Sequence, residues 1–291
     1  MSRRRELALA VALDLAVGEP PVRWHPVVGM GRLIDRLEEH LPAPGRPGGV
    51  LAGGVAWTLG AIVVGALATV LRRAPWPVRG VALWTVLSGR LLLREVSAVE
   101  GALRDGGTAA GRARVARLVS RPTDELSDAE VRMAAVETVA ENLADAWVAP
   151  LLWWRVAGLP AAAVHRWINT LDARWGYRDA TWTDRGRVAA RADDLANLVP
   201  ARVTALALRG RLDGPLRREA ARTDSPNAGW PMAAVALALD VRLAKRDTYA
   251  LHPTGRDPVA ATIPAAVRRV ALAGVVVAVA VGASAGSSGR R

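Results

Sequence analysis

Uncharged apolar segments alternate with long polar segments along this chain. The longest uncharged run covers residues 48–71 and lies between Arg46 and Arg72. As a helix it would be about 36 Å long, against roughly 30 Å of hydrocarbon in a bilayer. A buried core helix of a soluble protein seldom runs uncharged over this length. We therefore expect residues 48–71 to cross a membrane.

The other apolar segments are shorter, or they contain a charged residue. Residues 270–283 are uncharged but short for a membrane span, whereas residues 146–164 are interrupted by Arg155. Interrupted segments suit helices packed in a bundle, where polar groups face protein or a water-filled cavity. We expect an all-α, polytopic integral membrane protein of one domain, residues 1–291, whose extra-membrane helical loops carry the polar motifs. The predicted spans lie near residues 7–30, 48–71, 76–94, 146–164 and 267–285, with polar segments at 95–145 and 165–265.

Turn-forming residues divide the chain further. Residues 42–49 are rich in proline and glycine and indicate a linker. Ser127, with Glu130 three residues later, has the spacing of a capping box at a helix start. Short helices are expected near residues 187–197 and 233–241, and no alternating run is long enough to predict a sheet.

Composition excludes several classes of protein. Cysteine is absent, which rules out disulfide scaffolds, zinc fingers, iron–sulfur clusters and thiol nucleophiles. The net charge is +12, and Lys245 is the only lysine among 39 basic residues. The arginines are scattered rather than gathered with stacking aromatics, so we expect no nucleic-acid binding. The arginines fit a positive-inside bias, and the three consecutive arginines near the start of the chain predict a cytoplasmic N-terminus. The arginines also fit contacts with anionic lipids and anionic substrates.

One group of carboxylates recurs at helical spacing. Glu137, Glu141 and Asp145 stand four residues apart, so they would share one helix face, with Asn142 beside them. A solvated acidic face is the ordinary explanation of such a pattern. The face adjoins an apolar run, however, and carboxylate and amide oxygens suit Mg²⁺ that bridges to phosphates.

Other polar residues gather in three further places. Asn169 and Asp172 precede a second group made of Arg191, Asp193, Asp194, Asn197 and Arg202, although alternating Arg and Asp also form ordinary surface pairs. The turn of Ser225, Asn227 and Gly229 exposes backbone amides that favour anions, or it is a plain helix-entry turn. Near the N-terminus stand Asp14, His25 and Arg32. An acid inside an apolar helix, such as Asp14, is functional by default, because burying it alone is costly.

The order of these blocks resembles one known family. DLAVGEPPVRWHPVVGMGR (residues 14–32), ETVAENLADAWVAP (137–150), NTLDARWGY (169–177), ARADDLANLVPARVT (190–204) and SPNAGWP (225–231) are similar to motifs of the CobD/CbiB family, the membrane-bound adenosylcobinamide-phosphate synthases of cobalamin biosynthesis. The chain departs from the pattern at Ala144 and Ala146, where Ser and Gly are usual, and at Thr223 and Asp224, where a Lys-His pair is usual. The second departure puts a phosphate contact there in doubt.

The resemblance implies an enzyme with a defined reaction. It implies an ATP-dependent, Mg²⁺-dependent ligase that joins a carboxylate of adenosylcobyric acid to aminopropanol, or to its O-phosphate, through an amide bond. It also implies a multi-pass protein of the cytoplasmic membrane, in contact with lipid and with its active site facing the cytoplasm. A homo-oligomer, or association with other late-pathway cobamide enzymes, is left open. The alternatives are a non-catalytic membrane sensor resembling AmpE and, further from the motifs, a corrinoid transporter.

Residue roles follow from side-chain chemistry at the matching positions. The expected catalytic residues are Asp14, His25, Glu141 and Asp194, with Asp14 or His25 as proton acceptor. The expected metal ligands are Glu137, Glu141, Asp145 and Asp193. The expected substrate and nucleotide contacts are Arg32, Asn142, Asn169, Asp172, Arg191, Asn197, Arg202, Ser225, Asn227 and Gly229. The familiar P-loop, GxGxxG, GxSxG and HExxH motifs are missing, so a nucleotide would bind by an atypical route.

Overall fold

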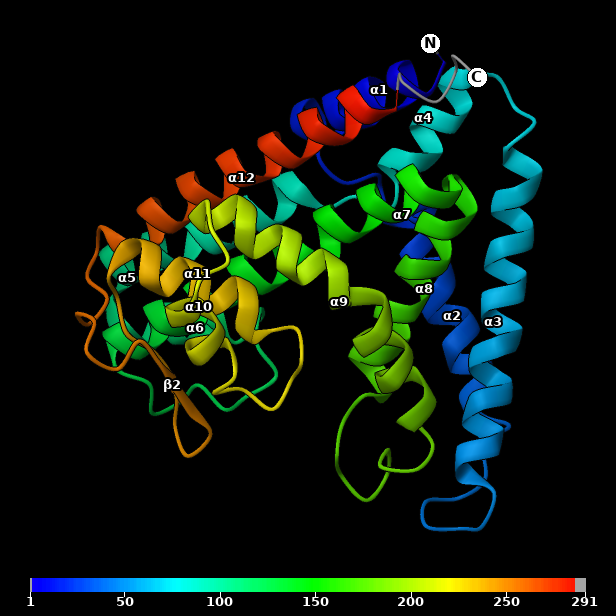
Figure 1. The fold of residues 1–291 in the computed structure, drawn as a ribbon. Coiled ribbons are helices and arrows are strands. Elements are labelled where there is room, and N and C mark those ends of the chain that lie inside the picture. Colours follow the sequence, from blue (N-terminus) through cyan, green and yellow to red (C-terminus); the bar gives the residue numbers. More distant parts are fainter. Residues whose placement is uncertain (1, 286–291) are drawn as a thin grey trace. The chain divides into compact units, whose positions relative to one another are not determined.

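The computed structural model describes residues 2–285 and is mostly helical (Figure 1). The described chain divides into two compact units built from interleaved segments. Unit 1 contains the residues up to Ser88, those of Ala149–Asn197 and those from Ala280 onward. Unit 2 contains Gly89–Val148 and Leu198–Val279. The prediction of a single CobD/CbiB-like domain stays a prediction.

Unit 1 is a helical assembly around a tryptophan-rich core. Its elements are α1 (Ser2–Ala16), the 3₁₀ turn η1 (Val22–Trp24), α2 (Pro26–Glu38), α3 (Gly49–Leu71), α4 (Trp76–Trp84), α7 (Ala149–Ala157) and α8 (Leu159–Trp175). Helix α1 packs on α4, and α8 packs against α2, α3 and α7 (Figure 1). Trp154, Trp167 and Trp175 are fully buried. A Cβ at Gly60 of α3 would overlap the ring of Trp167, so this glycine lets α3 and α8 approach closely.

Unit 2 is built around α6. Its elements are α5 (Gly89–Val115), α6 (Asp128–Leu143), the π-helical turn η2 (Ala144–Val148), α10 (Gly214–Ala220), α11 (Gly229–Leu239), β1 (Leu243–Lys245) and β2 (Tyr249–Leu251). Helix α6 packs against α5, α11 and β1. Two long helices, α9 (Arg187–Arg209) and α12 (Thr262–Ser284), contribute residues to both units.

Several local predictions are confirmed. Ser127 caps α6, and the reciprocal bonds with Glu130 form the expected capping box. Residues 42–48, between α2 and α3, contain no helix. Helix α5 contains a kink at Gly107, which adopts a φ of 70°, a conformation that favours glycine.

Three of the expected membrane segments are broken rather than continuous. Residues 7–30 form α1 and α2, because Gly18 turns with a φ of 83° and two prolines follow before His25 caps the next helix. Residues 76–94 are divided between α4, which ends at Trp84, and α5, which begins at Gly89. Residues 146–164 contain a π-helical turn, α7 and a break at Gly158, whose φ is 80°.

Helices α3 and α12 are long and apolar enough to cross a membrane, and they are the two such helices among the described residues. In their apolar stretches 22% of α3 and 39% of α12 are buried, whereas a core helix of a soluble protein would bury most of its residues. They correspond to the predicted spans 48–71 and 267–285.

The expectation of no sheet is wrong in one place. Strands β1 and β2 form an antiparallel hairpin in which Leu243 faces Leu251 and Lys245 faces Tyr249. Each strand has three residues, too few to show the alternation that a sequence pattern needs.

Candidate active site

In unit 1, helices α8 and α9 place several of the predicted polar residues together. His165, Asn169 and Asp172 stand on one face of α8, because they are spaced by four and three residues. Asp193 and Asn197 are one turn apart on α9, and Asn197 Nδ2 donates to Asp193 Oδ2 over 3.0 Å. Asn169 lies close enough to Asp193 to favour its charged form. The predicted residues Asn169, Asp193 and Asn197 therefore form one cluster.

His165 is a buried member of this cluster. Its side chain is 1 % exposed, and its Nε2 donates to Asn197 Oδ1 over 3.0 Å, because the amide of Asn197 already donates to Asp193. Burial lowers the pKa of His165 to about 4, so the ring is neutral at pH 7. Burial also raises the pKa of Asp193, and the neighbouring Asp194 adds to this effect. The cluster is a buried polar chain in which one neutral imidazole orients an amide, and that amide orients a carboxylate.

A second cluster in unit 1 forms where α1 and α2 are separated. Glu19 accepts hydrogen bonds from Ser88 Oγ and from His25 Nε2. His25 Nδ1 accepts from the backbone N–H of Val27 at the start of α2. Arg166 on α8 is near enough to Glu19 for the two charges to attract. Both nitrogens of His25 are thus engaged in holding Glu19 and α2, and its role as a proton acceptor stays a prediction.

The remaining predicted residues of unit 1 differ in their exposure. Asp14 on α1 is 1 % exposed, as expected for an acid inside an apolar helix. Asp172 lies against Gly176, where any Cβ would overlap its carboxylate, so the glycine of this motif leaves room for the acid. Arg191 and Asp194 form a loose surface pair at 3.9 Å, with the Arg191 side chain 79 % exposed. Arg32 on α2 is exposed and makes no ion pair with the described residues.

In unit 2, the central feature is a buried ion pair on α6. Arg121 Nη2 donates to Glu137 Oε2 over 2.7 Å, and Glu137 is 5 % exposed. The other oxygen of Glu137, Oε1, is buried and has no hydrogen-bond partner among the described residues, and the same is true of Arg121 Nε. Burial raises the pKa of Glu137 to about 7, although Arg121 counteracts this, and the charge of Glu141 raises it further. Buried polar atoms normally find partners, so these two open atoms suggest a place for a ligand.

The three predicted carboxylates are divided between two helical elements. Glu137, Glu141 and Asn142 lie on α6, where the Asn142 amide donates to Thr138 O over 3.0 Å. Asp145 lies in the π-helical turn η2, which changes the angular spacing between residues. Within residues 2–285 no group of three or more His, Asp or Glu side chains is placed to hold a metal ion. The predicted metal ligands also draw on both units, because Asp193 belongs to unit 1.

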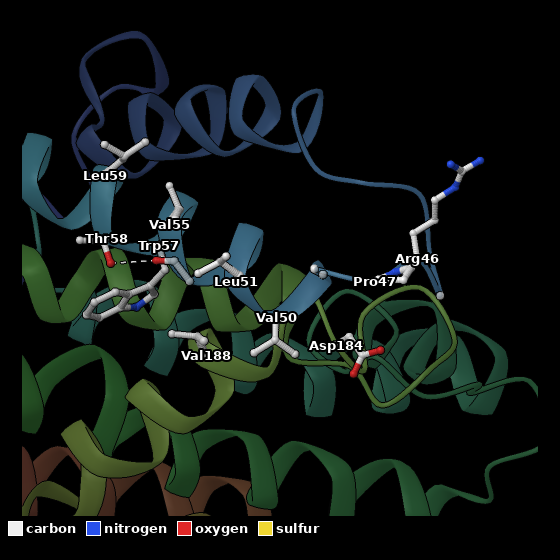
Figure 2. Close-up of a pocket in the computed structure, with 14 residues that line it drawn as sticks. Arg46, Pro47, Val50, Leu51, Val55, Trp57, Thr58, Leu59, Asp184 and Val188 are labelled. Atoms are coloured by element: carbon white, nitrogen blue, oxygen red, sulfur yellow. Dashed lines mark hydrogen bonds between the residues drawn. The ribbon is translucent and has the colours of Figure 1, made fainter.

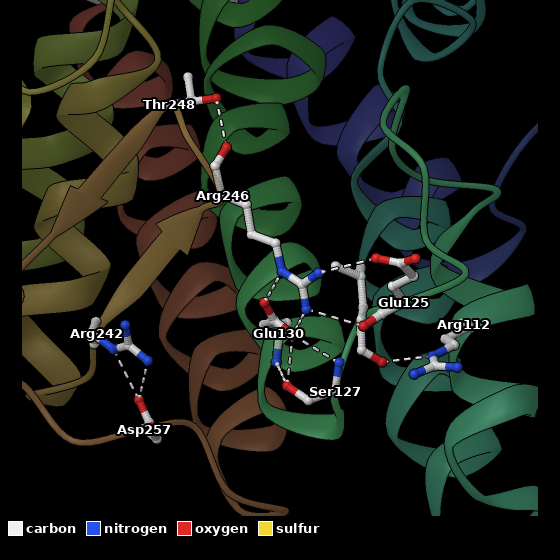
Figure 3. Close-up of polar contacts among 9 residues, drawn as sticks. Arg112, Glu125, Ser127, Glu130, Arg242, Arg246, Thr248 and Asp257 are labelled. Carbon is white, nitrogen blue, oxygen red and sulfur yellow. Dashed lines mark hydrogen bonds and ion pairs between the residues drawn. The ribbon is translucent and has the colours of Figure 1, made fainter.

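The Glu137 pair adjoins a polar cavity between the chain before α6 and the hairpin. The cavity has a volume of about 380 Å³, and its basic lining residues are Arg121, Lys245 and Arg246. Arg246 is neutralised by Glu130, to which it donates from Nη2 over 2.8 Å, and by Glu125 (Figure 3). The side chain of Lys245 makes no hydrogen bond or ion pair with the described residues. Tyr249, opposite Lys245, is near Glu137, and burial together with that charge raises the pKa of its phenol.

The predicted anion turn joins α9 to α11 through Arg202. Ser225 Oγ accepts from the backbone N–H groups of Asn227 and Ala228 and so closes the turn. Arg202 Nη1 donates to Asn227 Oδ1 over 2.8 Å, and its guanidinium lies 4.6 Å from the ring centre of Trp230. A Cβ at Gly229 would collide with Ala220 O and Thr223 Oγ1. The structure therefore brings together the predicted residues Arg202, Ser225, Asn227 and Gly229.

A larger cavity lies away from all of these residues. It has a volume of about 990 Å³ and follows the glycine-rich start of α3, with Arg46, Trp57 and Asp184 along it (Figure 2). It contains none of the predicted site residues. We assign it no part in the chemistry.

Sequence reasoning missed several residues that the structure places beside the predicted ones. Those residues are Glu19, Ser88, Arg121, His165, Arg166, Lys245 and Tyr249. Glu19 and Arg121 stood within or beside the recognised motifs, and Lys245 stood out as the single lysine of the chain. Tyr249 and Ser88 gave no signal of their own, because only the fold brings them to the acids.

Comparison with known proteins identifies the family. The model of the CobD/Cbib protein family matches residues 7–275. The chain belongs to the CobD/Cbib family. One relative in this family, the probable cobalamin biosynthesis protein CobD of Methanothermobacter thermautotrophicus, is 39% identical over 86% of this chain and 87% of its own length.

Two further CobD relatives are similar over comparable lengths. The cobalamin biosynthesis protein CobD of Stutzerimonas stutzeri is 43% identical over 82% of each chain. That of Rhodobacter capsulatus is 38% identical over 87% of this chain and 88% of its own. No solved structure matches the chain. The alignments include both units, so the CobD/Cbib likeness extends to the clusters in each.

Proposed function

We propose that this protein is an ATP-dependent amide ligase of cobalamin biosynthesis, an adenosylcobinamide-phosphate synthase. The observation that carries the proposal is the similarity to relatives named cobalamin biosynthesis protein CobD, which extends over more than four fifths of the chain. The substrates would be adenosylcobyric acid and aminopropanol or its O-phosphate. The clustering of the motif residues within each unit supports an enzyme rather than a sensor or a transporter.

The proposed reaction determines which groups the site must provide. A carboxylate is a poor electrophile, so transfer of a phosphoryl group from ATP to the substrate carboxylate would give an acyl phosphate with ADP as the leaving group. The amine then attacks the acyl carbon, the C–N bond forms, and phosphate leaves with the bonding electron pair. The amine must lose a proton in this step. Fixed cations that neutralise the developing charge contribute the largest share of such catalysis.

Unit 2 supplies groups suited to phosphates. Arg121, Lys245 and Arg202 present cationic groups, and Arg202 is oriented by Asn227 and Trp230. Mg²⁺ usually takes one or two carboxylates and shares phosphate oxygens and waters. Glu137, with its open buried oxygen, and Glu141 fit that donor set better than a cage of four acids. When bound, Mg²⁺ would neutralise phosphate charge.

Unit 1 supplies groups suited to the amine. Asp193, Asp194 and Asp172 are acids that can attract an ammonium group, and Asn169 and Asn197 orient Asp193. Asp14 would accept the proton, or His25 would do so after releasing one of the hydrogen bonds that its ring nitrogens make. Helices α3 and α12 would anchor the protein in the cytoplasmic membrane. Extraction from a membrane fraction by detergent but not by alkaline carbonate would support the anchoring.

A direct assay tests the proposal. The purified full-length protein would be incubated with adenosylcobyric acid, aminopropanol phosphate, ATP and Mg²⁺, and the product identified by mass spectrometry. We expect adenosylcobinamide phosphate, or adenosylcobinamide with the free amino alcohol, only when ATP is present. Folded protein that forms neither product would contradict the proposal.

A further inference from the structure

An apolar groove in unit 1 contains none of the residues of the two polar clusters in its lining. It has a volume of about 430 Å³, within the usual range of about 300–1,000 Å³ for small-molecule sites. Val63, Leu67 and Leu71 of α3 form one wall, and Met30 and Leu33 of α2 lie across from them, while α8 and the end of α4 complete the lining. The groove follows the second half of the helix that we propose to be membrane-embedded.

The lining of the groove has no unpaired polar side chain that could bind a polar ligand. Thr85 is the one polar side chain in its lining, and its hydroxyl already donates to Ala82 O over 2.9 Å. Leu67 is 65 % exposed and Val63 is 44 % exposed, so the α3 wall leaves large apolar side chains uncovered. An apolar chain is the ligand that would bury this surface without leaving a polar group unpaired.

Positive charge stands at one end of the groove. Arg72 and Arg73 directly follow Leu71, and both are exposed. Their side chains make no hydrogen bond or ion pair with the described residues. The next cation along the chain, Arg79, is already neutralised by Glu6 over 2.9 Å. Two unneutralised arginines therefore meet the groove where α3 ends, at the depth where a lipid headgroup would lie if α3 spans the bilayer.

We propose that this groove binds one acyl chain of an anionic phospholipid, with the lipid phosphate on Arg72 and Arg73. The proposal rests on the membrane placement of α3 but not on the ligase chemistry. A second copy of this chain seated in the groove would leave the two arginines without an anionic partner, whereas an anionic lipid satisfies both the apolar walls and the charge.

A pair of glycine variants tests the groove. Gly29 lines it, and a Cβ there would meet no atom within 4 Å, so Gly29→Leu would place a side chain in the groove without a clash. Gly31 lies two residues further along α2, has the same open surroundings and is not part of the lining, so Gly31→Leu is the matched control. Both replace a helical glycine with a better helix former.

The full-length protein would be purified in detergent and loaded from mixed micelles of dioleoyl phosphatidylglycerol or dioleoyl phosphatidylcholine. Retained lipid would be counted by native mass spectrometry. We expect the wild type and Gly31→Leu to retain phosphatidylglycerol and Gly29→Leu to lose it. The double variant Arg72→Gln, Arg73→Gln should bind phosphatidylglycerol roughly tenfold or more weakly, with its preference over phosphatidylcholine lost.

Three outcomes would overturn the proposal. They are equal retention by Gly29→Leu and Gly31→Leu, equal retention of the two lipids by the wild type, and a change of oligomeric state in Gly29→Leu with lipid retention unaltered. The third outcome would make the groove a contact between copies. The arginine variant is on the surface and reports even if Gly29→Leu fails to fold. Because lipid is counted without substrate, failure here is distinct from failure of the amide-forming assay.

Discussion

Arg121 donates to one oxygen of Glu137 over 2.7 Å, while the other oxygen of that carboxylate is buried without a partner among the described residues. A pair kept only for stability would be expected to satisfy both oxygens, because an open buried acceptor costs about 1–3 kcal/mol. The other buried pair on α6 does so: Arg132 reaches both oxygens of Glu100 over 2.8 Å each. Tyr249 is the other polar group among the described residues that reaches Glu137, and the unequal engagement of the two Glu137 oxygens marks this carboxylate as a candidate contact for a ligand.

The variant Glu137→Gln should therefore lose activity by about 100-fold or more while the protein still folds. Glutamine has the same size and still offers Arg121 an acceptor, but it removes the negative charge that would hold Mg²⁺ and phosphate. Steady-state kinetics of amide formation would measure the loss.

The matched control is Glu100→Gln. It weakens a comparably buried ion pair between α5 and α6, so it should lower the free energy of unfolding by a similar or larger amount. Its activity per folded molecule should stay within a few-fold of the wild type. Equal losses of activity in the two variants would mean that Glu137 acts through stability alone.

The tight turn before α11 depends on Gly229. Gly229→Ala would push a Cβ into Ala220 O and Thr223 Oγ1, so we expect a loss of about 1–3 kcal/mol in the free energy of unfolding. Gly101→Ala, inside α5 with only the tip of Arg104 nearby, should instead be neutral or stabilising by up to about 1 kcal/mol. Denaturant unfolding in detergent would compare the two, and a neutral Gly229→Ala would show that the turn can move.

A lysine side chain cannot reproduce the contacts of the Arg202 guanidinium. Arg202→Lys keeps the charge but loses the planar group that lies on Trp230 while it bonds Asn227, so kcat/KM should fall about tenfold or more. Arg242→Lys, in a surface pair with Asp257 (Figure 3), serves as the control and should change kcat/KM less than twofold. Similar effects in both would remove Arg202 from the site.

His165 gives the protein a defined dependence of stability on pH. Its pKa is about 4 in the folded chain and 6.5 as its ordinary value, so the unfolded chain binds the extra proton first as the pH falls. This contribution to stability is complete above pH 6.5, and about 3 kcal/mol of it is lost between pH 6.5 and 4. His165→Gln should show a shallower decline over that interval in pH-dependent unfolding, since other groups titrate alike in both proteins. Parallel curves would show that His165 is accessible to protons in the folded state.

The sequence predicted those features that depend on nearby residues. The capping box at Ser127, the helix over residues 49–71 and the Ser225–Gly229 turn follow from residues within a few positions of one another. It assigned Arg202 and Asn227 to separate groups of candidate contacts, and the structure brings these two residues together.

The features it missed depend on contacts between distant residues or on backbone detail. The partner of Glu137 is 16 residues away on a loop, and Ser88 meets Glu19 across 69 positions. A regular helical spacing predicts one face for Glu137, Glu141 and Asp145, and that shared face stays a prediction. The π-helical turn that contains Asp145 was missed, because no composition rule locates such a turn. Glu19, Pro20 and Pro21 indicate a break within residues 7–30. The apolar residues on both sides nevertheless led to the prediction of one membrane span there.

The fate of the substrate's carboxylate oxygen tests the central claim most directly. Adenosylcobyric acid labelled with ¹⁸O in its free carboxylate would be converted with aminopropanol phosphate, ATP and Mg²⁺, and the released phosphate analysed by mass spectrometry. An acyl phosphate intermediate predicts one ¹⁸O transferred to inorganic phosphate for each amide formed, with the total transfer lowered about 100-fold or more in Glu137→Gln. Label found in AMP, or amide formed without transfer of label to phosphate, would contradict the account.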